Sequence, residues 1–454
     1  MRILLVNPAA KQLRICRPGD RPVASWMYRS GRVSLLAVAA ATPEVHDIRF
    51  LDEHVEPIDY DVKVDVVGVS FSTPLAPRAY EIGDEFRRRG VPVIFGGYHA
   101  TFLPDEALAH ADSVCLGEAE PVWARMLHDL EHWKLSRSYH SVCRPDLQRL
   151  RPLRRVQWDA DAHEVLNVVM AGRGCPRACD FCSVTEFFGN TYRHRTVADV
   201  IEEIRATGDR FIQLGDDNII SDPVFTADLF RAMAELDIRW MGQSTISIAD
   251  DPALLRLAVE SGCSGLFIGL ESLNRENLEG SEKGFCDAAR YAEAIARIRD
   301  AGIAVMSGFV FGLDHDDYRA FDRTVNFIKK TGVIATQLAI LTPFPGTRVY
   351  DKLTREQRII DKDWSRYDYR HVVFQPKRMT AAELQDGTDW AIAETWSLRS
   401  MALNALGLLT DLGPKGLFLC ALPMSIACRQ DFRNRNTPRG FRRVARMPSP
   451  SVSS

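Results

Sequence analysis

Three cysteines in the middle of the chain have the type and spacing that most clearly predict chemistry. Cys175, Cys179 and Cys182 form the pattern C-x3-C-x2-C within residues 171–183. Four thiolates saturate an ordinary four-iron, four-sulfur cluster, so three leave one iron without a protein ligand. An iron with an open position can bind and activate a small molecule. The triplet therefore predicts a cluster that takes part in chemistry.

Structural zinc and disulfides are the alternatives for these cysteines. A zinc site would need a fourth Cys or His at a matching spacing, and the nearest histidines, His163 and His194, have no partner in an H-x3-H arrangement. A disulfide needs an oxidising compartment, whereas residues 1–8 have a buried strand pattern and not that of a signal peptide. The spacing favours the cluster over both, and we expect a cytoplasmic protein.

The pattern C-x3-C-x-aromatic-C, with Phe181 as the aromatic residue, resembles the signature of the radical S-adenosylmethionine (SAM) superfamily. The resemblance implies that the open iron binds the amino and carboxylate groups of SAM. It also implies that an electron from the reduced cluster cleaves the sulfonium, which gives a 5'-deoxyadenosyl radical that abstracts a hydrogen atom. The protein would hold the cofactors while they carry the chemistry. Phe181 is accordingly a predicted cofactor-binding residue.

Length and composition predict several domains and no membrane span. A chain of 454 residues with 46% hydrophobic residues can bury two or three cores. The formal net charge of -3 gives little support for nucleic acid as a partner. No stretch approaches the ~20 apolar residues of a transmembrane segment. The apolar run 416–428 is broken by Pro423, and we expect a core or substrate-covering helix there, with a lipophilic contact as the alternative.

The first third of the chain alternates short apolar strands with helices. Strands are predicted at residues 2–7, 46–51, 64–70 and 91–95, and helices at 32–41 and 77–89. Such alternation is typical of a parallel, doubly wound sheet with right-handed crossovers. Ligands of these sheets lie outside the carboxyl ends of the strands.

Two loops at those strand ends carry candidate ligand-binding residues. Ser70, Ser72 and Thr73 follow the third strand, and Gly96 and Gly97 follow the fourth. The hydroxyl groups supply adaptable hydrogen bonds, and paired glycines let a bulky ligand approach the backbone. An ordinary turn is the alternative for the glycine pair.

Residues 1 to about 140 resemble the cobalamin-binding domain of cobalamin-dependent radical SAM enzymes, with these two loops and an acidic segment at 115–120. The resemblance implies that the nucleotide tail of the corrinoid lies between the loops, and Tyr98 and His99 join the predicted cofactor-binding residues. The family's D-x-H-x2-G motif is missing from residues 8–19, and His54 follows the second strand instead. We therefore expect bound cobalamin to lack a histidine ligand on its lower face.

A second series of strands and helices follows a Pro- and Arg-rich stretch, residues 143–164, which we interpret as a linker. Strands are predicted at 165–170, 210–214, 238–241, 265–269, 305–311 and 336–341, separated by helices such as 197–207 and 252–261. Six such units suit a partial (β/α)6 barrel, which is also the core fold of the superfamily. Barrel enzymes place their chemistry at the carboxyl ends of the strands.

Polar residues gather at the ends of these predicted strands. Two adjacent acids follow the second strand, where the superfamily receives the amino group of SAM, and a helix N-cap is the alternative for them. Polar residues ending the third and fourth strands resemble positions that meet the ribose or carboxylate of SAM, with a structural hydrogen bond as the alternative. Residues 342–347 resemble a turn near the adenine, or form only a rigid turn. The candidates are Gly215, Asp216, Asp217, Gln243, Ser244 and Glu271.

The resemblance suggests a division of the chain into five parts. These are a cobalamin-binding domain at 1–142, a linker at 143–164, a partial barrel at 165–360, a helical substrate-covering region at 361–440 and a disordered tail at 441–454. Only Cys16 and Cys115 precede residue 140, and only Cys420 and Cys428 lie beyond 360, so one cluster is expected.

A cobalamin domain followed by a single-cluster barrel resembles methyltransferases that act on unactivated carbon. By this resemblance one SAM methylates cob(I)alamin and another generates the substrate radical. The expected substrate is a small molecule such as a natural product, a lipid or a tetrapyrrole, and the expected partner is an electron donor such as flavodoxin or ferredoxin. A cobalamin-dependent cyclase or oxidase and a non-catalytic corrinoid-binding or redox-sensing protein are the alternatives. No residue is identified as a hydrogen donor or general base.

Overall fold

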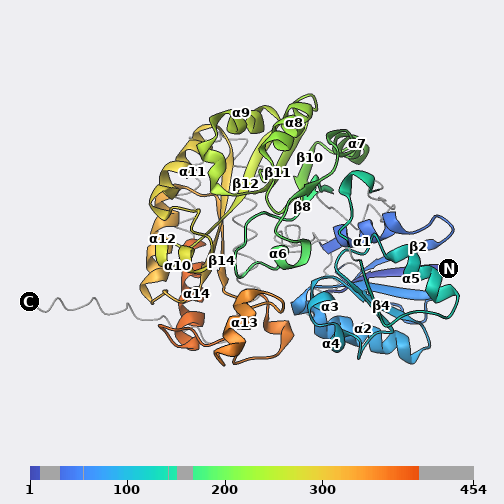
Figure 1. Cartoon of the computed structure of the whole chain (residues 1–454). Coiled ribbons are helices and arrows are strands. Elements are labelled where there is room, and N and C mark those ends of the chain that lie inside the picture. Colours follow the sequence, from blue (N-terminus) through green and yellow to red (C-terminus); the bar gives the residue numbers. More distant parts are fainter. Residues whose placement is uncertain (11–30, 55, 142, 151–166, 398–454) are drawn as a thin grey trace, which may run out of the picture.

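The computed structural model describes residues 1–10, 31–54, 56–141, 143–150 and 167–397 (Figure 1). They form two parallel sheets of six strands each and one two-stranded ribbon. The predicted α/β fold class is confirmed. Residues 151–164 of the predicted linker, the apolar run 416–428 and the predicted tail 441–454 lie outside the described residues.

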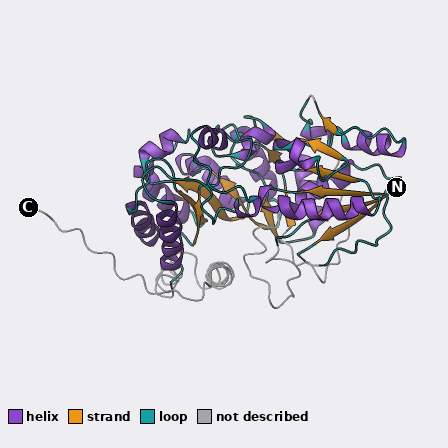
Figure 2. Cartoon of the chain, turned by 90° about the horizontal axis from the view of Figure 1, so that it is seen from below, coloured by secondary structure: helices purple, strands orange, loops and turns teal. Residues whose placement is uncertain are grey.

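The first sheet lies in the N-terminal domain and has the spatial order β2-β1-β3-β4-β5-β6. Its strands are β1 (Arg2–Asn7), β2 (Asp47–Asp52), β3 (Val66–Ser70), β4 (Val93–Gly96), β5 (Ser113–Leu116) and β6 (Ser138–His140). Its helices are α1 (Gly31–Ala41), α2 (Ala76–Arg88), α3 (Tyr98–Phe102), α4 (Pro104–Ala107) and α5 (Trp123–Glu131). Helices cover both faces of this sheet (Figures 1 and 2).

The apolar run of β1 supplies both cores of this domain. Leu4 and Val6 belong to the core on the side of α2. Ile3 and Leu5 belong to the core on the side of α1 and α5. Successive side chains of a strand point to opposite faces, so a continuous apolar run is what a strand covered on both faces requires.

The second sheet follows the chain order, β7-β10-β11-β12-β13-β14, and its helices lie on the outer side (Figure 1). The strands are β7 (Asn167–Val169), β10 (Phe211–Leu214), β11 (Arg239–Ser244), β12 (Cys263–Glu271), β13 (Ala304–Phe311) and β14 (Ala335–Ile340). The helices are α6 (Ser183–Phe188), α7 (Val197–Thr207), α8 (Pro223–Ala234), α9 (Pro252–Glu260), α10 (Arg275–Gly280), α11 (Tyr291–Asp300), α12 (Arg319–Thr331), α13 (Arg348–Arg355) and α14 (Ala381–Thr395).

All ten strands predicted from the sequence form within a few residues of their expected positions. The prediction missed β5 and β6, which have only four and three residues. It also missed the antiparallel ribbon of β8 (Gly172–Arg173) and β9 (Arg193–His194). Strands this short have too few residues to show the alternation of apolar and polar side chains that marks a strand.

Within the described part of the chain, no helix combines the length and the apolar character that crossing a membrane requires.

Two glycines of the N-terminal domain allow a test of its local packing. Gly97 and Gly90 both have positive φ, 91° and 79°. A Cβ atom at Gly97 would lie 2.7 Å from the carbonyl oxygen of Phe71, whereas one at Gly90 would meet no described atom within 4 Å. We expect Gly90→Ala to cost only the ~1–2 kcal/mol of left-handed backbone strain, and Gly97→Ala to cost more. Thermal unfolding followed by circular dichroism compares the two midpoints, and equal losses would contradict the close approach of Gly97 to Phe71.

Candidate functional site

The cluster loop, residues 171–183, runs from β8 to α6 and carries the three cysteines of the sequence motif. Cys175, Cys179 and Cys182 are free thiols and are half-buried. Cys182 precedes α6 as its N-cap residue, and its N–H donates to the carbonyl of Cys179 at 3.2 Å. Among the described residues, no three His, Cys, Asp or Glu side chains converge so as to hold a single metal ion.

Backbone donors make the cluster loop suitable for bound thiolates. Burial raises the pKa of Cys182 to about 11, and the N–H groups of Val184 and Thr185 oppose that rise. Burial also raises the pKa of Cys175, and the N–H of Arg177 opposes it. The thiolate is the form of cysteine that binds iron. Donors directed at the sulfur atoms therefore fit an anionic iron–sulfur cluster.

Lys283 adds a positive charge beside the cluster loop. Burial raises the pKa of Cys179 to about 12, and the Lys283 ammonium is the main group that lowers it. The Lys283 Nζ lies 2.6 Å from Glu271 Oε1 and donates to the carbonyl of Gly269 at 2.8 Å. Sequence reasoning missed Lys283, because it stands twelve residues from Glu271 and no spacing relates the two.

Glu271 ends β12 in an unusual backbone conformation, with φ at 62°. The register of β12 on β13 shifts between Gly269 and Glu271. Positive φ is uncommon for residues other than glycine, and such strain concentrates at functional sites. The predicted contact of Glu271 with SAM stays a prediction, and the structure adds its ion pair with Lys283.

Asp216 and Asp217 fasten the cluster loop to the end of β10. Asp216 is fully buried, and its two oxygens accept from the N–H of Ala171 at 3.0 Å and from the hydroxyl of Tyr192 at 2.9 Å. Burial raises the pKa of Asp216 to about 7. Asp217 accepts from the N–H of Gly174 at 3.1 Å. Both acids thus anchor the loop, and their binding to the SAM amino group stays a prediction.

The helix-cap alternative for these two acids is wrong. The N-cap residue of the next helix, α8, is Asp222, whose side chain accepts from the N–H groups of Val224 and Phe225.

The remaining predicted SAM-binding residues lie around the same end of the barrel. Gly215 follows β10, and its N–H donates to the carbonyl of Val169 at 2.8 Å. Gln243 is exposed, whereas the buried Ser244 donates to the carbonyl of Thr245 at 3.0 Å. That bond is the ordinary structural alternative for Ser244. Phe181 packs against the barrel core.

The two predicted corrinoid loops lie side by side at the ends of β3 and β4. Ser72 is exposed, Thr73 is buried, and the half-buried Ser70 has its Oγ 3.2 Å from that of Ser34. Gly96 pairs with Ser70 in the sheet register, and Gly97 lies against the backbone of Phe71. The close approach of two backbones is what the glycine pair permits.

Tyr98 and His99 point to different surroundings. The Tyr98 ring lies 4.5 Å from that of Phe187 in α6. Burial raises the pKa of Tyr98, with Asp217 and Cys182 adding to the rise. Tyr98 therefore stands between the Gly-Gly loop and the cluster loop.

His99 instead lies in the core behind the Gly-Gly loop. Its Nε2 is 3.0 Å from the hydroxyl of Tyr80, and its ring meets Trp364 edge-on at 5.2 Å. Burial lowers the pKa of His99. Among the described residues its Nδ1 has no hydrogen-bond partner. The contact with Trp364 makes His99 part of the packing between the N-terminal domain and the segment after α13.

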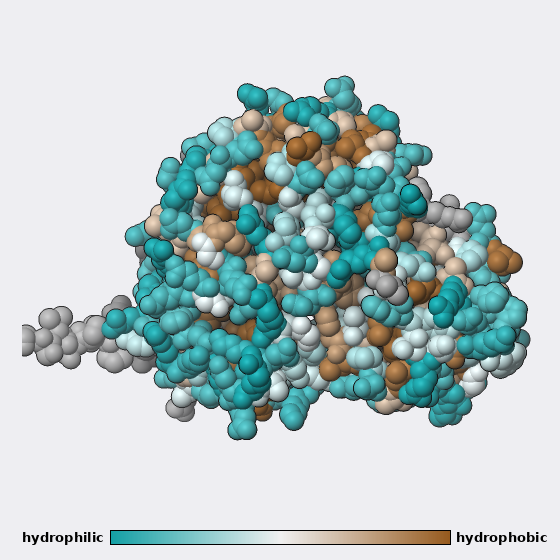
Figure 3. Space-filling view, in the orientation of Figure 1, coloured by the Kyte–Doolittle hydropathy of each residue, from teal (hydrophilic) through white to brown (hydrophobic). Residues whose placement is uncertain are grey.

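An aromatic seam joins the N-terminal domain to the cluster loop. It consists of Tyr98 and Phe102 on α3 and Phe187 and Phe188 on α6. A Cβ atom at Gly346 would lie 2.3 Å from the Phe102 ring, so the turn 342–347 packs directly on this seam. Figure 3 shows apolar surface in the region where the two domains meet. The seam places the corrinoid loop and the cluster loop at one junction.

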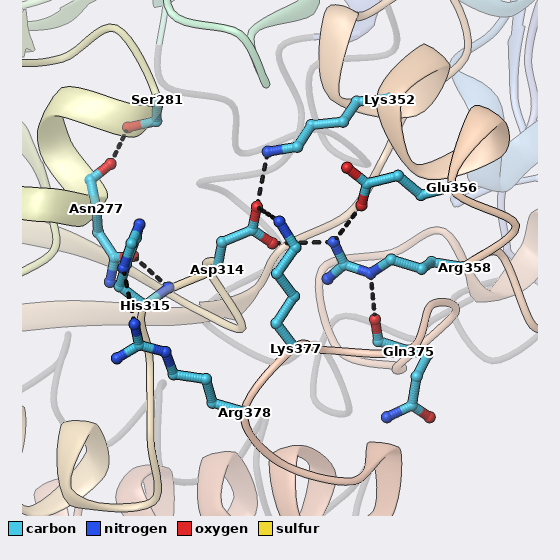
Figure 4. A network of polar contacts seen from close by, with 10 residues as sticks. All are labelled: Asn277, Ser281, Asp314, His315, Lys352, Glu356, Arg358, Gln375, Lys377 and Arg378. Atoms are coloured by element: carbon cyan, nitrogen blue, oxygen red, sulfur yellow. Dashed lines mark hydrogen bonds and ion pairs between the residues drawn. The ribbon is translucent and has the colours of Figure 1, made fainter.

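Asp314 fastens α13 and the segment after it to the loop that follows β13 (Figure 4). Its carboxylate accepts from Lys352 at 2.7 Å, from Arg358 at 2.9 Å and from Lys377 at 2.8 Å. Although burial opposes it, these three cations hold the pKa of Asp314 well below its usual range. Sequence reasoning missed this network, since its members are spread over more than sixty positions.

Buried ion pairs connect the acidic segment of the N-terminal domain to the cluster loop. Arg173 binds Glu118 at 2.7 Å and Glu120 at 2.6 Å. Glu118 also binds Arg193 at 2.8 Å. In the sequence, residues 115–120 stand out only as an acidic segment. No pattern in them indicates that Arg173 and Arg193 are their partners.

The three motif cysteines predict a specific loss of iron on substitution. We expect the wild-type protein to bind about four iron and four sulfide per chain, and replacement of Cys175, Cys179 or Cys182 by Ala to abolish the intact cluster. Cys286 is buried beside Lys283, so Cys286→Ala is a matched control that should keep full iron content. Iron and sulfide analysis of anaerobically reconstituted protein measures the cluster content of the wild type, the three variants and the control. Equal loss in the control, or a full cluster in any of the three variants, would contradict the assignment.

Two known families match the chain, the B12 binding domain at residues 27–126 and the radical SAM superfamily at residues 169–328. Bacteriochlorophyllide d C-12(1)-methyltransferase from Chlorobaculum tepidum is 32% identical over 376 residues, which cover 79% of this chain and 82% of that protein. Bacteriochlorophyllide d C-8(2)-methyltransferase from the same organism is 31% identical over 396 residues, which cover 82% and 87%.

A solved structure shares the fold of this chain across both domains. The radical S-adenosylmethionine methyltransferase TsrM from Kitasatospora setae, with cobalamin and a 4Fe-4S cluster bound, aligns with a TM-score of 0.68 at 15% identity. The alignment covers 95% of this chain and 99% of that one. With the sequence identity extending through both domains, the chain belongs to the cobalamin-dependent radical SAM C-methyltransferases, whose cofactors are cobalamin, a 4Fe-4S cluster and SAM.

Proposed function

We propose that this enzyme methylates a carbon atom of a chlorophyll-type tetrapyrrole. The proposal rests on the sequence identity of 32% and 31% to two methyltransferases that act on bacteriochlorophyllide d. The aromatic seam is consistent with such a substrate, because aromatic side chains offer flat apolar faces to a conjugated macrocycle. The two relatives act at different positions of the macrocycle, C-12(1) and C-8(2).

The placement of the loops supports methyl transfer at the domain junction. When bound, the cluster and SAM supply a radical, and the corrinoid supplies the methyl group. Tyr98 extends from the Gly-Gly loop to within 4.5 Å of Phe187, five residues after the last cluster cysteine. Asp216 and Asp217 hold the cluster loop, and the half-buried seam residues pack beside it.

We also propose that a small acidic redox protein, such as flavodoxin or ferredoxin, reduces the cluster in the cytoplasm. Arg177 in the cluster loop supports this, because it is exposed between the first two cysteines. The nearby Arg348 donates to the carbonyl of Ala178, but its charge is paired with Glu282 at 2.6 Å. An exposed positive charge at Arg177 would steer an acidic partner toward the cluster.

We further propose that the region from residue 361 covers the substrate. The indole N–H of Trp364 donates to Glu106 in α4 at 2.8 Å. The Asp314 network holds the following segment at the ends of the barrel strands. Together these contacts support a wall that runs from the barrel to the N-terminal domain.

The methylation assay uses reconstituted enzyme, bacteriochlorophyllide d, a reductant and SAM with a deuterated methyl group. We expect a product that carries the label, together with S-adenosylhomocysteine and 5'-deoxyadenosine. Mass spectrometry measures all three, and the Cys182→Ala variant should form no deoxyadenosine. Deoxyadenosine without a methylated product would favour a cyclase or oxidase. Methylation of a lipid or another small molecule in place of the tetrapyrrole would overturn the substrate class alone.

A further inference from the structure

The ion pairs of Arg173 lie where the two cofactor-binding loops meet. Arg173 is 9% exposed, and the side chains of Glu118 and Glu120 are 4% and 9% exposed. Burial lowers the pKa of the Arg173 guanidinium, but the carboxylates of Glu120 and Glu118 more than offset this and keep it raised. With Arg193, two positive and two negative charges balance. Removing one member would leave a buried charge without its partner, which is strongly destabilising.

A chain of hydrogen bonds leads from these ion pairs to the Gly-Gly loop. Glu118 follows Gly117, whose N–H donates to the hydroxyl of Thr101 at 3.0 Å. The same hydroxyl donates to the carbonyl of Gly97 at 2.8 Å. A displacement of Glu118 would therefore shift the Gly-Gly loop, which is predicted to hold the corrinoid tail.

A second chain leads from Arg173 to the cluster. Arg173 stands two positions before Cys175, and the N–H of the intervening Gly174 donates to Asp217 at 3.1 Å. Gly174 has φ of 87°, and a Cβ atom there would lie 2.3 Å from the carbonyl oxygen of Thr191. The backbone between Arg173 and Cys175 is thus held from two directions.

We propose that Arg173 is a positioning residue that couples the two cofactor sites energetically. Ligation of the cluster by Cys175 restrains further the loop that carries Arg173, and Arg173 in turn holds Glu118 and the Gly-Gly loop in the arrangement that accepts the corrinoid. Cobalamin therefore binds more tightly to the cluster-loaded protein than to the cluster-free protein. Because coupling between two binding sites is reciprocal, cobalamin stabilises the cluster in return.

The ion pair of Arg195 with Glu203 provides a matched control. Arg195 is buried to about the same degree as Arg173, and Glu203 is equally inaccessible. Both residues belong to the barrel, where Arg195 also donates to the carbonyl of Met170. Arg195→Met thus breaks a buried ion pair of the same chemistry that does not cross the domain junction.

The experiment measures the dissociation constant of hydroxocobalamin by absorbance titration, with and without the reconstituted cluster. In the wild type we expect the two constants to differ severalfold, within the usual range of about 5–150-fold for coupled sites. Arg173→Met should bring them to equality, while Arg195→Met keeps the wild-type ratio. Arg173→Lys should keep only part of the ratio, because one ammonium cannot reproduce the forked contact to two carboxylates.

A second measurement covers the case in which a cluster-free variant does not fold. The rate at which a chelator removes iron from cluster-loaded protein is measured with and without bound cobalamin. Cobalamin should slow this loss in the wild type and in Arg195→Met but not in Arg173→Met, because coupling between the two sites is reciprocal. The proposal is overturned if the wild type shows no coupling, if Arg173→Met keeps it in full, or if Arg195→Met loses it equally. None of these results depends on which substrate the enzyme methylates.

Discussion

Arg173 carries a buried positive charge from the cluster loop to two carboxylates of the cobalamin-binding domain. Charges taken out of water are costly to bury, and they are tolerated only with well-placed partners. Apolar surfaces can shift relative to one another with little loss of contact free energy. A guanidinium that forks between two carboxylates has one favourable geometry. The domain junction therefore has a defined register. The aromatic seam of α3 and α6 supplies the apolar area beside it, and the ion pairs determine how the two surfaces meet.

Both sheets present the carboxyl ends of their strands at this junction. In the first sheet the ends of β3 and β4 lead into the Ser/Thr loop and the Gly-Gly loop. In the second, β10 ends at the two acids that hold the cluster loop. Close packing of the backbone at Gly97 and Gly346 brings the elements nearer than side chains would allow. The loops predicted to hold the corrinoid and the cluster thus lie at one junction, as methyl transfer from SAM to the corrinoid would require.

What the sequence could predict is the part of the structure that depends on local pattern. The cysteine spacing lies within eight residues and is independent of the rest of the fold. Most strands of the two sheets are apolar runs, and their alternation with helices indicates parallel sheets. Residues whose roles depend on distant partners were not predictable in this way. Lys283 is paired with Glu271 and Arg173 with Glu118, and neither pair has a characteristic spacing. His99 follows the Gly-Gly pair and so shared its predicted role, although its side chain turns into the core and packs on Trp364.

The loops predicted to hold the corrinoid and the cluster meet at one junction, so the two bound cofactors should be neighbours. Dipolar electron paramagnetic resonance of the frozen, fully loaded enzyme measures their proximity, with cobalt(II) and the reduced cluster as the two spins. We expect a measurable magnetic interaction between them and faster relaxation of the cobalt signal when the cluster is reduced. Two independent spectra that simply add, with unchanged cobalt relaxation, would contradict it.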